Sequence, residues 1–402
     1  MSWEYVALGE LYEVHNGLSK GGKFFGKGSP FLSFSTVFNK WFLPQELLDL
    51  VQSTDNEQQS YSILRGDVFV TRTSETMDEL GMSSVALKDY PHATYNGFTK
   101  RLRPINPERI LPEFIGYYLR TAVFRAGFTA FSTMTTRASL RNEDLLSMKV
   151  PVPDMQAQKH IASILFAYDD LVESNQKQIK LLEEAAQRLY KEWFVDLRFP
   201  GHETTPIVDG IPQGWERMVL SEVTSVLKRG ISPKYSDNGK YSVINQKCIR
   251  SSIMDISESR RQEKEYVPTL NLQDSDTVIC STGTGTLGRV GRVYGDYPNT
   301  TFDSHVTLVR AKENPNYIYH VVKSQQEYLM GMGRGSTNQQ ELYRDVIERL
   351  VVLCPSQDIL LKADRVLNAI HCKIKAVYLQ NNLLVESRDR LLPKLMSGEL
   401  EV

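Results

Sequence analysis

Residues 155–196 read MQAQKHIASILFAYDDLVESNQKQIKLLEEAAQRLYKEWFVD, and this stretch predicts one long helix. Its apolar side chains recur at alternating intervals of four and three residues, the pattern of a coiled-coil seam on one helical face. The seam residues are Ile161, Leu165, Tyr168, Val172, Asn175, Ile179, Leu182, Ala186, Leu189 and Trp193. Prolines stand just before and just after the stretch, and none lies within it. At ~1.5 Å per residue the seam spans roughly 50 Å, so the predicted helix needs a partner.

A second seam near the C-terminus is the predicted partner. It alternates at three and four residues through Leu360, Ala363, Leu367, Ile370, Ile374, Val377, Asn381, Leu384, Arg388, Leu391 and Leu395. We expect the two helices to pair antiparallel within one chain. Asn175 and Asn381 then face each other, and a polar pair in an apolar seam fixes the register at some cost in stability. The alternative is that each asparagine tolerates partial exposure at a helix surface.

Composition limits the class of protein. The chain has 402 residues, 41% hydrophobic and 24% charged, as expected for a soluble globular protein of two or three domains. The net charge of −1 gives no overall basic signal, so any nucleic-acid surface must be local. Four cysteines without CxxC spacing predict free thiols. No signal peptide and no apolar run of about 20 residues is present, so we expect a cytoplasmic protein without a membrane span.

The two halves of the sequence repeat each other. The pattern W-E-x-x-x-L-x-E-aliphatic occurs at residues 3–11 and again at 215–223. A loop rich in Gly and Lys follows in each half, then a strand that begins with an acidic turn, at 66–70 and 275–279. Each half closes with a short helix, an apolar strand and a proline before its long helix. So long a period indicates a domain duplication rather than a solenoid.

The predicted fold is therefore α+β. It has two mixed α/β domains joined by two long antiparallel coiled-coil helices, with pseudo-two-fold internal duplication. The expected parts are a first domain (1–153), a first helix (154–198), a linker (199–213), a second domain (214–355), a second helix (356–396) and a tail (397–402).

Two glycine-rich segments imitate nucleotide-binding motifs. Residues 283–288 match G-x-G-x-x-G, but a strand pattern follows them where a dinucleotide site needs a helix. We therefore expect a hairpin whose backbone approaches a neighbour closely. Residues 21–28 nearly match a phosphate-binding loop, but Gly28 replaces the Ser/Thr and Pro30 follows. A basic, flexible loop is the expectation there. The sequence contains no H-E-x-x-H, G-x-S-x-G or Asn/Asp-Pro-Pro motif, so we predict no catalytic residues and no metal site.

Basic and aromatic residues cluster in matching segments of both halves. Such residues supply phosphate contacts and, where bidentate to guanine, base recognition. The DNA-binding candidates of the first half are Lys20, Lys23, Lys27, Arg72, Lys100, Arg101, Arg103 and Arg137. Those of the second half are Lys228, Arg229, Lys234, Tyr235, Lys247, Arg250, Arg260, Arg261, Arg289, Arg292 and Arg334. An ordinary solvated surface is the alternative for each of them.

Four motifs together resemble one family. They are Trp193-Phe194-Val195-Asp196-Leu197-Arg198-Phe199-Pro200-Gly201-His202-Glu203, the tail Arg390-Leu391-Leu392-Pro393-Lys394-Leu395-Met396-Ser397-Gly398-Glu399-Leu400, Ile211-Pro212-Gln213-Gly214-Trp215-Glu216, and Gly230-Ile231-Ser232-Pro233-Lys234-Tyr235 with Val243-Ile244-Asn245-Gln246. They resemble the specificity subunits of type I restriction–modification systems, over the whole chain and in the same domain order. The first domain departs most, because its loop lacks the proline of the second.

The resemblance implies a function. Each domain would recognise one half of a bipartite double-stranded DNA target through the major groove. The helices would set the spacer and bind two modification (methyltransferase) subunits, which use S-adenosylmethionine for N6-adenine methylation. Restriction subunits would add cleavage driven by ATP with Mg. This chain would be non-catalytic and hold no cofactor itself. The alternatives are a scaffold that bridges proteins without recognising DNA and, less favoured, an enzyme that binds a nucleotide at residues 283–288.

Overall fold

The computed structural model describes residues 3–74, 80–131, 138–335 and 340–400. Arg137, one of the predicted DNA-binding residues, lies outside the described residues. The chain divides into two compact units. Unit 1 comprises Met1–Glu173 and Asn382–Val402, and unit 2 comprises Ser174–Asn381. Both units therefore contain part of each predicted long helix.

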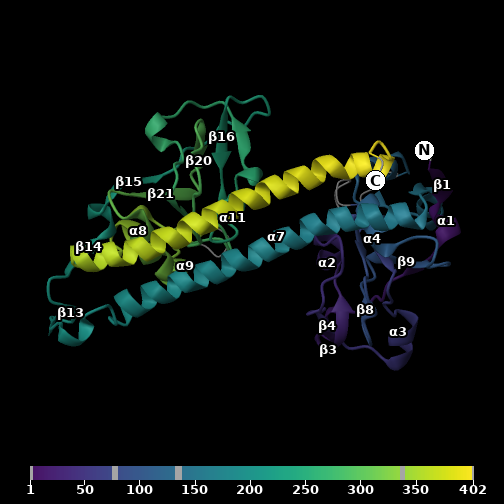
Figure 1. Cartoon of the computed structure of the whole chain (residues 1–402), viewed down its shortest axis with the longest axis horizontal. Coiled ribbons are helices and arrows are strands. Elements are labelled where there is room, and N and C mark those ends of the chain that lie inside the picture. The colour runs from purple at the N-terminus through teal and green to yellow at the C-terminus, as the bar shows by residue number, and fades with distance from the viewer. Residues whose placement is uncertain (1–2, 75–79, 132–137, 336–339, 401–402) are drawn as a thin grey trace. The chain divides into compact units, whose positions relative to one another are not determined.

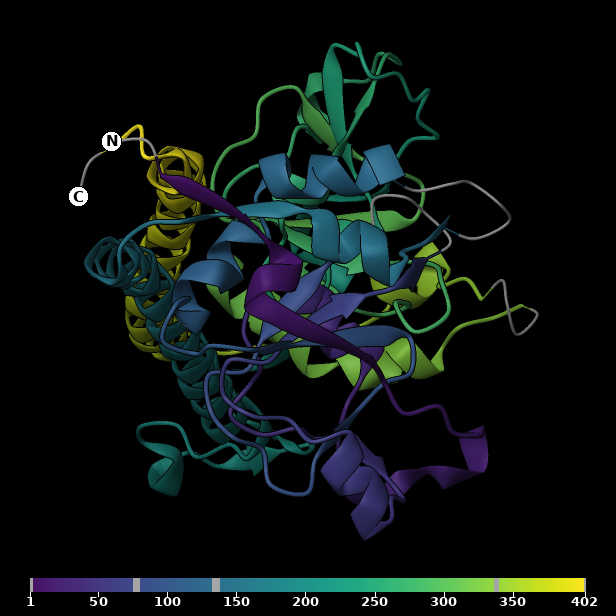
Figure 2. The ribbon, with the colours of Figure 1, turned by 90° about the vertical axis from the view of Figure 1, so that its right-hand side faces the viewer.

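Two long helices confirm the prediction from the seams. Helix α7 covers Met155–Tyr190 and continues as the π-helix η3, Lys191–Val195. Helix α11 covers Gln357–Ser397. Within each unit the two helices lie side by side (Figures 1 and 2), and the residues of each helix continue from one unit into the other. None of the helices in the described part of the chain combines the length and the hydropathy of a membrane-spanning segment.

The seam residues pack as an antiparallel pair requires. In unit 1, Ile161 and Leu165 near the start of α7 share a core with Leu392 and Leu395 near the end of α11. In unit 2, Leu182 packs in one cluster with Ile374. Early residues of one helix thus meet late residues of the other.

The asparagines of the two seams are in contact. Asn175 Nδ2 donates a hydrogen bond of 2.9 Å to Asn381 Oδ1. The two residues are only 8% and 7% exposed, which rules out the alternative of partial exposure at a helix surface. That this pair sets the register stays a prediction.

Unit 1 is built from short strands and short helices. The strands are β1 (Glu4–Ala7), β2 (Tyr12–Asn16), β3 (Phe25–Leu32), β4 (Leu50–Val51), β5 (Val68–Thr71), β6 (Thr73–Ser74), β7 (Ser83–Val85), β8 (Thr94–Tyr95), β9 (Thr99–Pro104), β10 (Ala138–Ser139) and β11 (Lys149–Val152). The helices are α1 (Leu8–Leu11), η1 (Gly22–Phe24), α2 (Phe34–Asn39), α3 (Asp55–Ser60), α4 (Pro112–Tyr118), α5 (Ala122–Phe131) and α6 (Asn142–Ser147).

Unit 2 has a similar inventory. Its strands are β12 (Ile207–Val208), β13 (Ile211–Pro212), β14 (Glu216–Val219), β15 (Thr224–Arg229), β16 (Tyr241–Ile244), β17 (Arg260–Gln262), β18 (Thr277–Cys280), β19 (Val290–Arg292), β20 (Thr300–Phe302), β21 (Val306–Ala311) and β22 (Val351–Cys354). Its helices are η4 (His202–Thr204), η5 (Leu220–Glu222), η6 (Gln246–Cys248), η7 (Ile256–Glu258), η8 (Pro268–Leu270), α8 (Pro315–Ser324), α9 (Gln326–Gly331) and α10 (Arg344–Glu348).

The sheets of the two units have the same topology, which confirms the predicted duplication. The four-stranded sheet runs β2-β9-β5-β7 in unit 1 and β15-β21-β18-β19 in unit 2. The three-stranded sheet runs β4-β3-β8 and β17-β16-β20. The first strand of each globular domain pairs with the last strand before its long helix, β1 with β11 and β14 with β22. This pairing brings the start of each domain to the strand that precedes its long helix.

The repeated W-E-x-x-x-L-x-E pattern has a structural role at the start of each domain. Leu8 and Leu220 are fully buried in the cores of their units. Each glutamate accepts a hydrogen bond from the backbone N–H three residues earlier: Ala7 N donates to Glu10 Oε1 and Val219 N to Glu222 Oε2. The side chain thus satisfies a backbone N–H at the start of a helical turn.

A buried carboxylate–guanidinium pair also repeats. In unit 1, Arg103 Nη2 donates to Asp67 Oδ2 at 2.6 Å, and in unit 2, Arg310 Nη2 donates to Asp276 Oδ2 at 2.7 Å. Each arginine also donates through Nε to the other oxygen of the same carboxylate, so both contacts are bidentate. The pairs clamp the acidic turn before β5 and β18 to the central strands β9 and β21.

The structure confirms the prediction for one glycine-rich segment and contradicts it for the other. Residues 283–288 form a turn between strands β18 and β19, as predicted, and a Cβ at Gly288 would come within 2.6 Å of the Met330 backbone. For residues 21–28 the expectation of a flexible loop is wrong. They form η1 and the first half of β3, which pairs with β4. Main-chain pairing to Val51 gives this glycine-rich segment a regular structure.

A buried histidine pair attaches α11 to unit 2. His320 Nε2 on α8 lies 3.0 Å from His371 Nε2 on α11, and His371 Nδ1 lies 2.8 Å from the Tyr294 hydroxyl. Burial, together with the nearby positive charge of Arg292, lowers the pKa of His320 to about 3 and that of His371 to about 2. Both imidazoles are therefore neutral in the folded protein at neutral pH.

This pair predicts an acid-sensitive stability. Below pH 6.5 the unfolded chain binds a proton at each histidine while the folded chain does not, so the free energy of unfolding falls by up to roughly 3 kcal/mol per pH unit as the pH drops toward 4. Urea unfolding of His371→Gln should show a shallower fall between pH 6 and 4 than wild type. The exposed His160→Gln serves as control and should follow wild type. Identical slopes in H371Q and wild type would contradict this account.

The asparagine pair predicts non-additive mutations. Asn175→Leu leaves Asn381 buried without this partner and should lower the free energy of unfolding by about 1–3 kcal/mol. Replacing both residues by leucine removes the desolvation cost on both sides, so the double variant should be at least as stable as wild type. Chemical unfolding of the three proteins measures this cycle. A double variant less stable than either single variant would contradict the pairing.

Candidate nucleic-acid interface

Several strands of unit 2 end at one edge of its sheets. Strand β15 ends at Arg229, opposite Thr307 of β21, and β18 ends at Cys280, opposite Val306. Strands β16 and β20 run parallel and end together at Ile244 and Phe302. The loops that follow these ends therefore meet. We call residues 229–235, 245–250, 281–289 and 303–305 the strand-end edge of unit 2.

Side-chain contacts tie these loops together. Gln246 Nε2 donates to Thr282 Oγ1 at 3.1 Å, and Thr282 Oγ1 lies 2.6 Å from His305 Nδ1. Arg229 forms an ion pair with Glu341. A Cβ at Gly230 would come within 2.2 Å of the carbonyl oxygens of Phe302 and Asp303, so only glycine allows this approach. These contacts hold the loops of the edge together as one surface.

An aromatic–guanidinium contact lies on this edge. The guanidinium carbon of Arg260 is 3.7 Å from the centroid of the Tyr235 ring. Partial burial raises the pKa of Tyr235, and the nearby carboxylate of Asp303 raises it further. Burial also raises the pKa of Asp303 itself, against the hydrogen bond that His305 N donates to its Oδ1 at 2.9 Å.

The same edge exists in unit 1. Leu18 bridges Asn96 as Ile231 bridges Asp303, and Gly17 approaches the Asn96 carbonyl as Gly230 approaches that of Asp303. Phe98 N donates to Asn96 Oδ1 at 2.7 Å, which repeats the bond of His305 N to Asp303. The two edges thus share one backbone arrangement.

The side chains on the two edges differ. Where unit 2 has the buried carboxylate Asp303 and the imidazole of His305, unit 1 has the amide Asn96 and the apolar ring of Phe98, which is 55% exposed. Arg72 donates to Asn16 Oδ1 at 3.4 Å in unit 1, whereas the residue that corresponds to Asn16 is Arg229. The two edges therefore share one backbone arrangement but present different hydrogen-bonding groups.

The structure separates the predicted basic residues by accessibility. The exposed ones are Lys23, Lys27, Lys228, Lys234, Lys247, Arg250, Arg260, Arg261 and Arg334, while Lys20, Arg72, Arg229 and Arg289 are partly buried. Some already have acidic partners: Lys20 pairs with Glu57 at 2.7 Å and Lys234 with Glu263 at 2.9 Å. Tyr235 is exposed and stacked as described.

Three predicted DNA contacts need correction. Arg101 is 4% exposed and donates to Ser62 O at 2.7 Å. Arg103 is held by Asp67. Arg292 is 1% exposed and donates to Asn316 Oδ1 at 2.7 Å. Arg101 and Arg292 are buried, and Arg103, although 27% exposed, forms a bidentate contact with a buried carboxylate, so all three charges have partners inside the fold.

Lys100 is also buried, and burial lowers its pKa.

Sequence reasoning missed the residues that assemble the edge, namely Gln246, Thr282, His305 and Glu341. Their contacts join segments far apart in the sequence, and no local pattern marks them. The sequence does contain a signal for the structural role of Arg103. An aspartate in a turn and an arginine in a later strand occur in both halves, as Asp67 with Arg103 and as Asp276 with Arg310.

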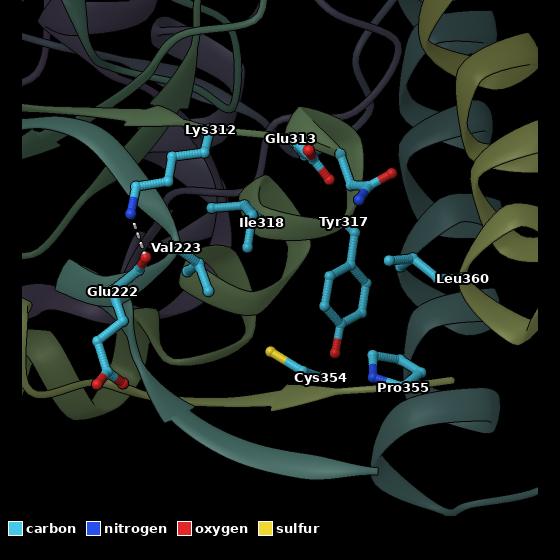
Figure 3. A pocket seen from close by; sticks show the side chains of 10 residues that line it. Glu222, Val223, Lys312, Glu313, Tyr317, Ile318, Cys354, Pro355 and Leu360 are labelled. Carbon is cyan, nitrogen blue, oxygen red and sulfur yellow. Dashed lines mark hydrogen bonds between the residues drawn. The ribbon is translucent and has the colours of Figure 1, made fainter. Parts of the chain in front are cut away.

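A pocket of about 260 Å³ lies at the other end of the four-stranded sheet (Figure 3). It is lined by residues that flank β15 and β21 and by the entry to α11, and Lys312 Nζ donates to Glu222 O at 2.7 Å across it. Burial raises the pKa of the Cys354 thiol, and the carboxylates of Glu216 and Glu222 raise it further. The thiol is thus protonated rather than nucleophilic at neutral pH. Among the described residues, no group of three or more His, Cys, Asp or Glu is placed to hold a metal ion.

Comparison with known proteins agrees with this architecture. The family model of the type I restriction modification DNA specificity domain matches residues 1–184 and 212–359. The chain is 28% identical over 334 residues to the MjaIX specificity subunit of Methanocaldococcus jannaschii, covering 79% of this chain and 75% of that protein. It is 22% identical over 373 residues to the HindI specificity subunit of Haemophilus influenzae, covering 73% and 79%.

The fold also matches a solved structure. The S subunit of a type I restriction–modification system from M. genitalium aligns over 98% of this chain and 96% of that chain, with a TM-score of 0.56 and 15% identity. Two matched domains in one chain define the class as a DNA specificity protein. The chain belongs to the type I restriction–modification DNA specificity family, as a specificity subunit.

The correction at Arg103 makes a prediction. Arg103→Ala leaves the fully buried Asp67 carboxylate without its bidentate partner, so the free energy of unfolding should fall by about 3 kcal/mol. Lys27→Ala removes an exposed charge and should change stability by less than about 0.5 kcal/mol. Urea unfolding of both full-length variants measures the difference. An R103A protein as stable as wild type but weaker on DNA would restore Arg103 as a DNA contact.

Proposed function

We propose that each unit of this chain recognises one half of a bipartite double-stranded DNA target through its strand-end edge. The observation that supports this most strongly is the pairing of one scaffold with two different edges. The entry pairing, the sheet order and the Asp–Arg clamp repeat, whereas Asp303 and His305 replace Asn96 and Phe98. Two copies of one protein scaffold with different hydrogen-bonding groups suit two different base sequences.

The edges carry the chemistry that DNA recognition needs. Exposed lysines and arginines contact phosphates without regard to sequence, and amide, hydroxyl and guanidinium groups contact base edges. Unit 2 offers Lys228 and Lys247 for the first role and Arg260 for the second. Because the chain as a whole carries a net charge of −1, partner subunits would supply much of the phosphate-neutralising surface.

The long helices would set the spacer between the two halves. Each helix passes through both units without interruption, and the paired seams stiffen them. The spacer length would thus follow from the number of helical residues between the units.

The helices also offer a surface for the modification subunits. Leu361, Cys372 and Leu379 are exposed on α11, whereas Ala363, Ile374 and Val377 of the seam are buried. Leu361 and Leu379 are 18 residues apart, which is five helical turns, so they share a face. We propose that two methyltransferase subunits, which bring S-adenosylmethionine, bind such faces, and that restriction subunits bring ATP and Mg. This chain would contribute recognition and no catalysis.

Methylation mapping tests the proposal. The chain is expressed with its modification subunit, and N6-methyladenine is located across host DNA by single-molecule sequencing. A two-part motif with a spacer of undefined sequence, methylated once on each strand, is the expected result. A modification subunit that is folded and bound to the chain, yet methylates no such motif, would favour the alternative of a protein-bridging scaffold.

The spacer role predicts the effect of an insertion. Four helix-forming residues inserted after Glu173 in α7 and four before Asn382 in α11 lengthen each helix by ~6 Å. Since B-DNA rises ~3.4 Å per base pair, the mapped spacer should grow by one or two base pairs while both half-sites stay the same. Four residues inserted between Asp209 and Gly210 in the linker are the control and should leave the spacer unchanged. An unchanged spacer in the helix variant would contradict the proposal.

A further inference from the structure

We propose that Arg260, positioned by Tyr235, recognises a guanine in the half-site of unit 2. This assignment rests on the proposed function and names one specificity-determining residue within it. It comes from a contact that neither the charge pattern nor the fold requires: an exposed guanidinium placed 3.7 Å from the centroid of an aromatic ring. Such a contact fixes a long side chain that would otherwise sample many rotamers.

Arg260 stands on a rigid element. It is the first residue of β17 and pairs with Val243 of the central strand β16, which also pairs with β20. Asn245, two residues beyond Val243, is buried, and Asp303 lies at the matching end of β20. The guanidinium therefore projects from the three-stranded sheet at the strand-end edge, where the proposed DNA contact lies.

Tyr235 is itself held in place by its backbone. It forms a bridge with Gln262 of β17. The segment that carries it is fixed at both ends by glycines, because a Cβ at Gly230 would come within 2.2 Å of Phe302 O and one at Gly239 within 2.5 Å of the Gln262 backbone. The ring is thus a fixed platform, and Tyr235 is a positioning residue for Arg260.

The guanidinium of Arg260 has more N–H donors than its contact with Tyr235 uses. Within the described part of the chain, no carboxylate forms an ion pair with Arg260, although Lys234 on the adjoining segment pairs with Glu263, and Arg250 approaches Glu258 at 4.0 Å. A guanidinium carries five N–H donors, so a hydrogen bond to the Tyr235 hydroxyl leaves enough for a bidentate contact. Guanine presents the matching pair of acceptors, N7 and O6, in the major groove, and this is the commonest specific contact of arginine.

Neighbouring residues provide a matched control. Arg261 follows Arg260 directly, is also exposed, and points to the opposite face of the strand because successive side chains alternate. Replacing either arginine by glutamine removes one positive charge from the same strand. Only the replacement of Arg260 should weaken the preference for one base in the methylated motif.

The test is methylation mapping of the assembled complex with wild-type chain, Arg260→Gln and Arg261→Gln. In R260Q, one guanine of one half-site should lose roughly 10- to 100-fold of its preference over the other bases, while the second half-site and the spacer stay unchanged. R261Q should give the wild-type motif. Tyr235→Ala should relax the same guanine position, and Tyr235→Phe, which keeps the ring face, should preserve it.

Three results would overturn the assignment. An R260Q motif identical to that of wild type removes Arg260 as a base contact. An even loss of methylation over all positions, matched by R261Q, makes Arg260 a phosphate contact only. A wild-type complex that methylates no two-part motif removes the proposed function and this assignment together, which distinguishes that failure from the other two.

Discussion

The apolar seam between α7 and α11 is the constraint on which the rest of the structure depends. The two helices are separated in sequence by the whole of the second domain, and each would expose a long apolar stripe if it stood alone. Burying Ile161 and Leu165 with Leu395, and Leu182 with Ile374, forces the chain to return antiparallel to itself. Each domain must therefore end its strands at the entry to a long helix, and the β1–β11 and β14–β22 pairs meet that requirement.

The domains use their two ends for different purposes. At the end near the acidic turns, Asp67 and Asp276 accept bidentate contacts from Arg103 and Arg310, so the same charges serve stability in both units. At the other end the strands stop, and the loops are free to differ. Burial of a charge pair requires good geometry, which keeps the scaffold constant, whereas exposed loop residues carry little of the folding free energy. This division allows one fold to hold two recognition surfaces.

The sequence predicted the helices, their direction and the duplication because each leaves a local or periodic trace. Seam spacing, a repeated entry pattern and prolines beside the helices are visible without tertiary structure. Accessibility was not visible. Arg101, Arg103 and Arg292 appeared as surface cations, yet Arg101 and Arg292 are buried and Arg103 pairs with a buried carboxylate, where a charge is tolerated once it is hydrogen-bonded.

The candidate interface was harder to predict than the fold for the same reason. Gln246, Thr282 and His305 come together only because three strands end at one edge. Arg260 was one of several basic residues until the structure placed it against Tyr235, since the two are 25 positions apart in sequence. Chemistry that depends on strand order has no local signature, so loops could be proposed from the sequence but their partners could not.

We propose that the two units recognise their half-sites independently of each other. The most direct measurement is the affinity of the chain, assembled with its modification subunit, for four duplexes: both half-sites intact, either one scrambled, and both scrambled. At fixed salt, each scrambled half-site should lower the affinity by at least about tenfold, and the two losses should multiply. Affinity that depends on one half-site alone, or on neither, would contradict the account.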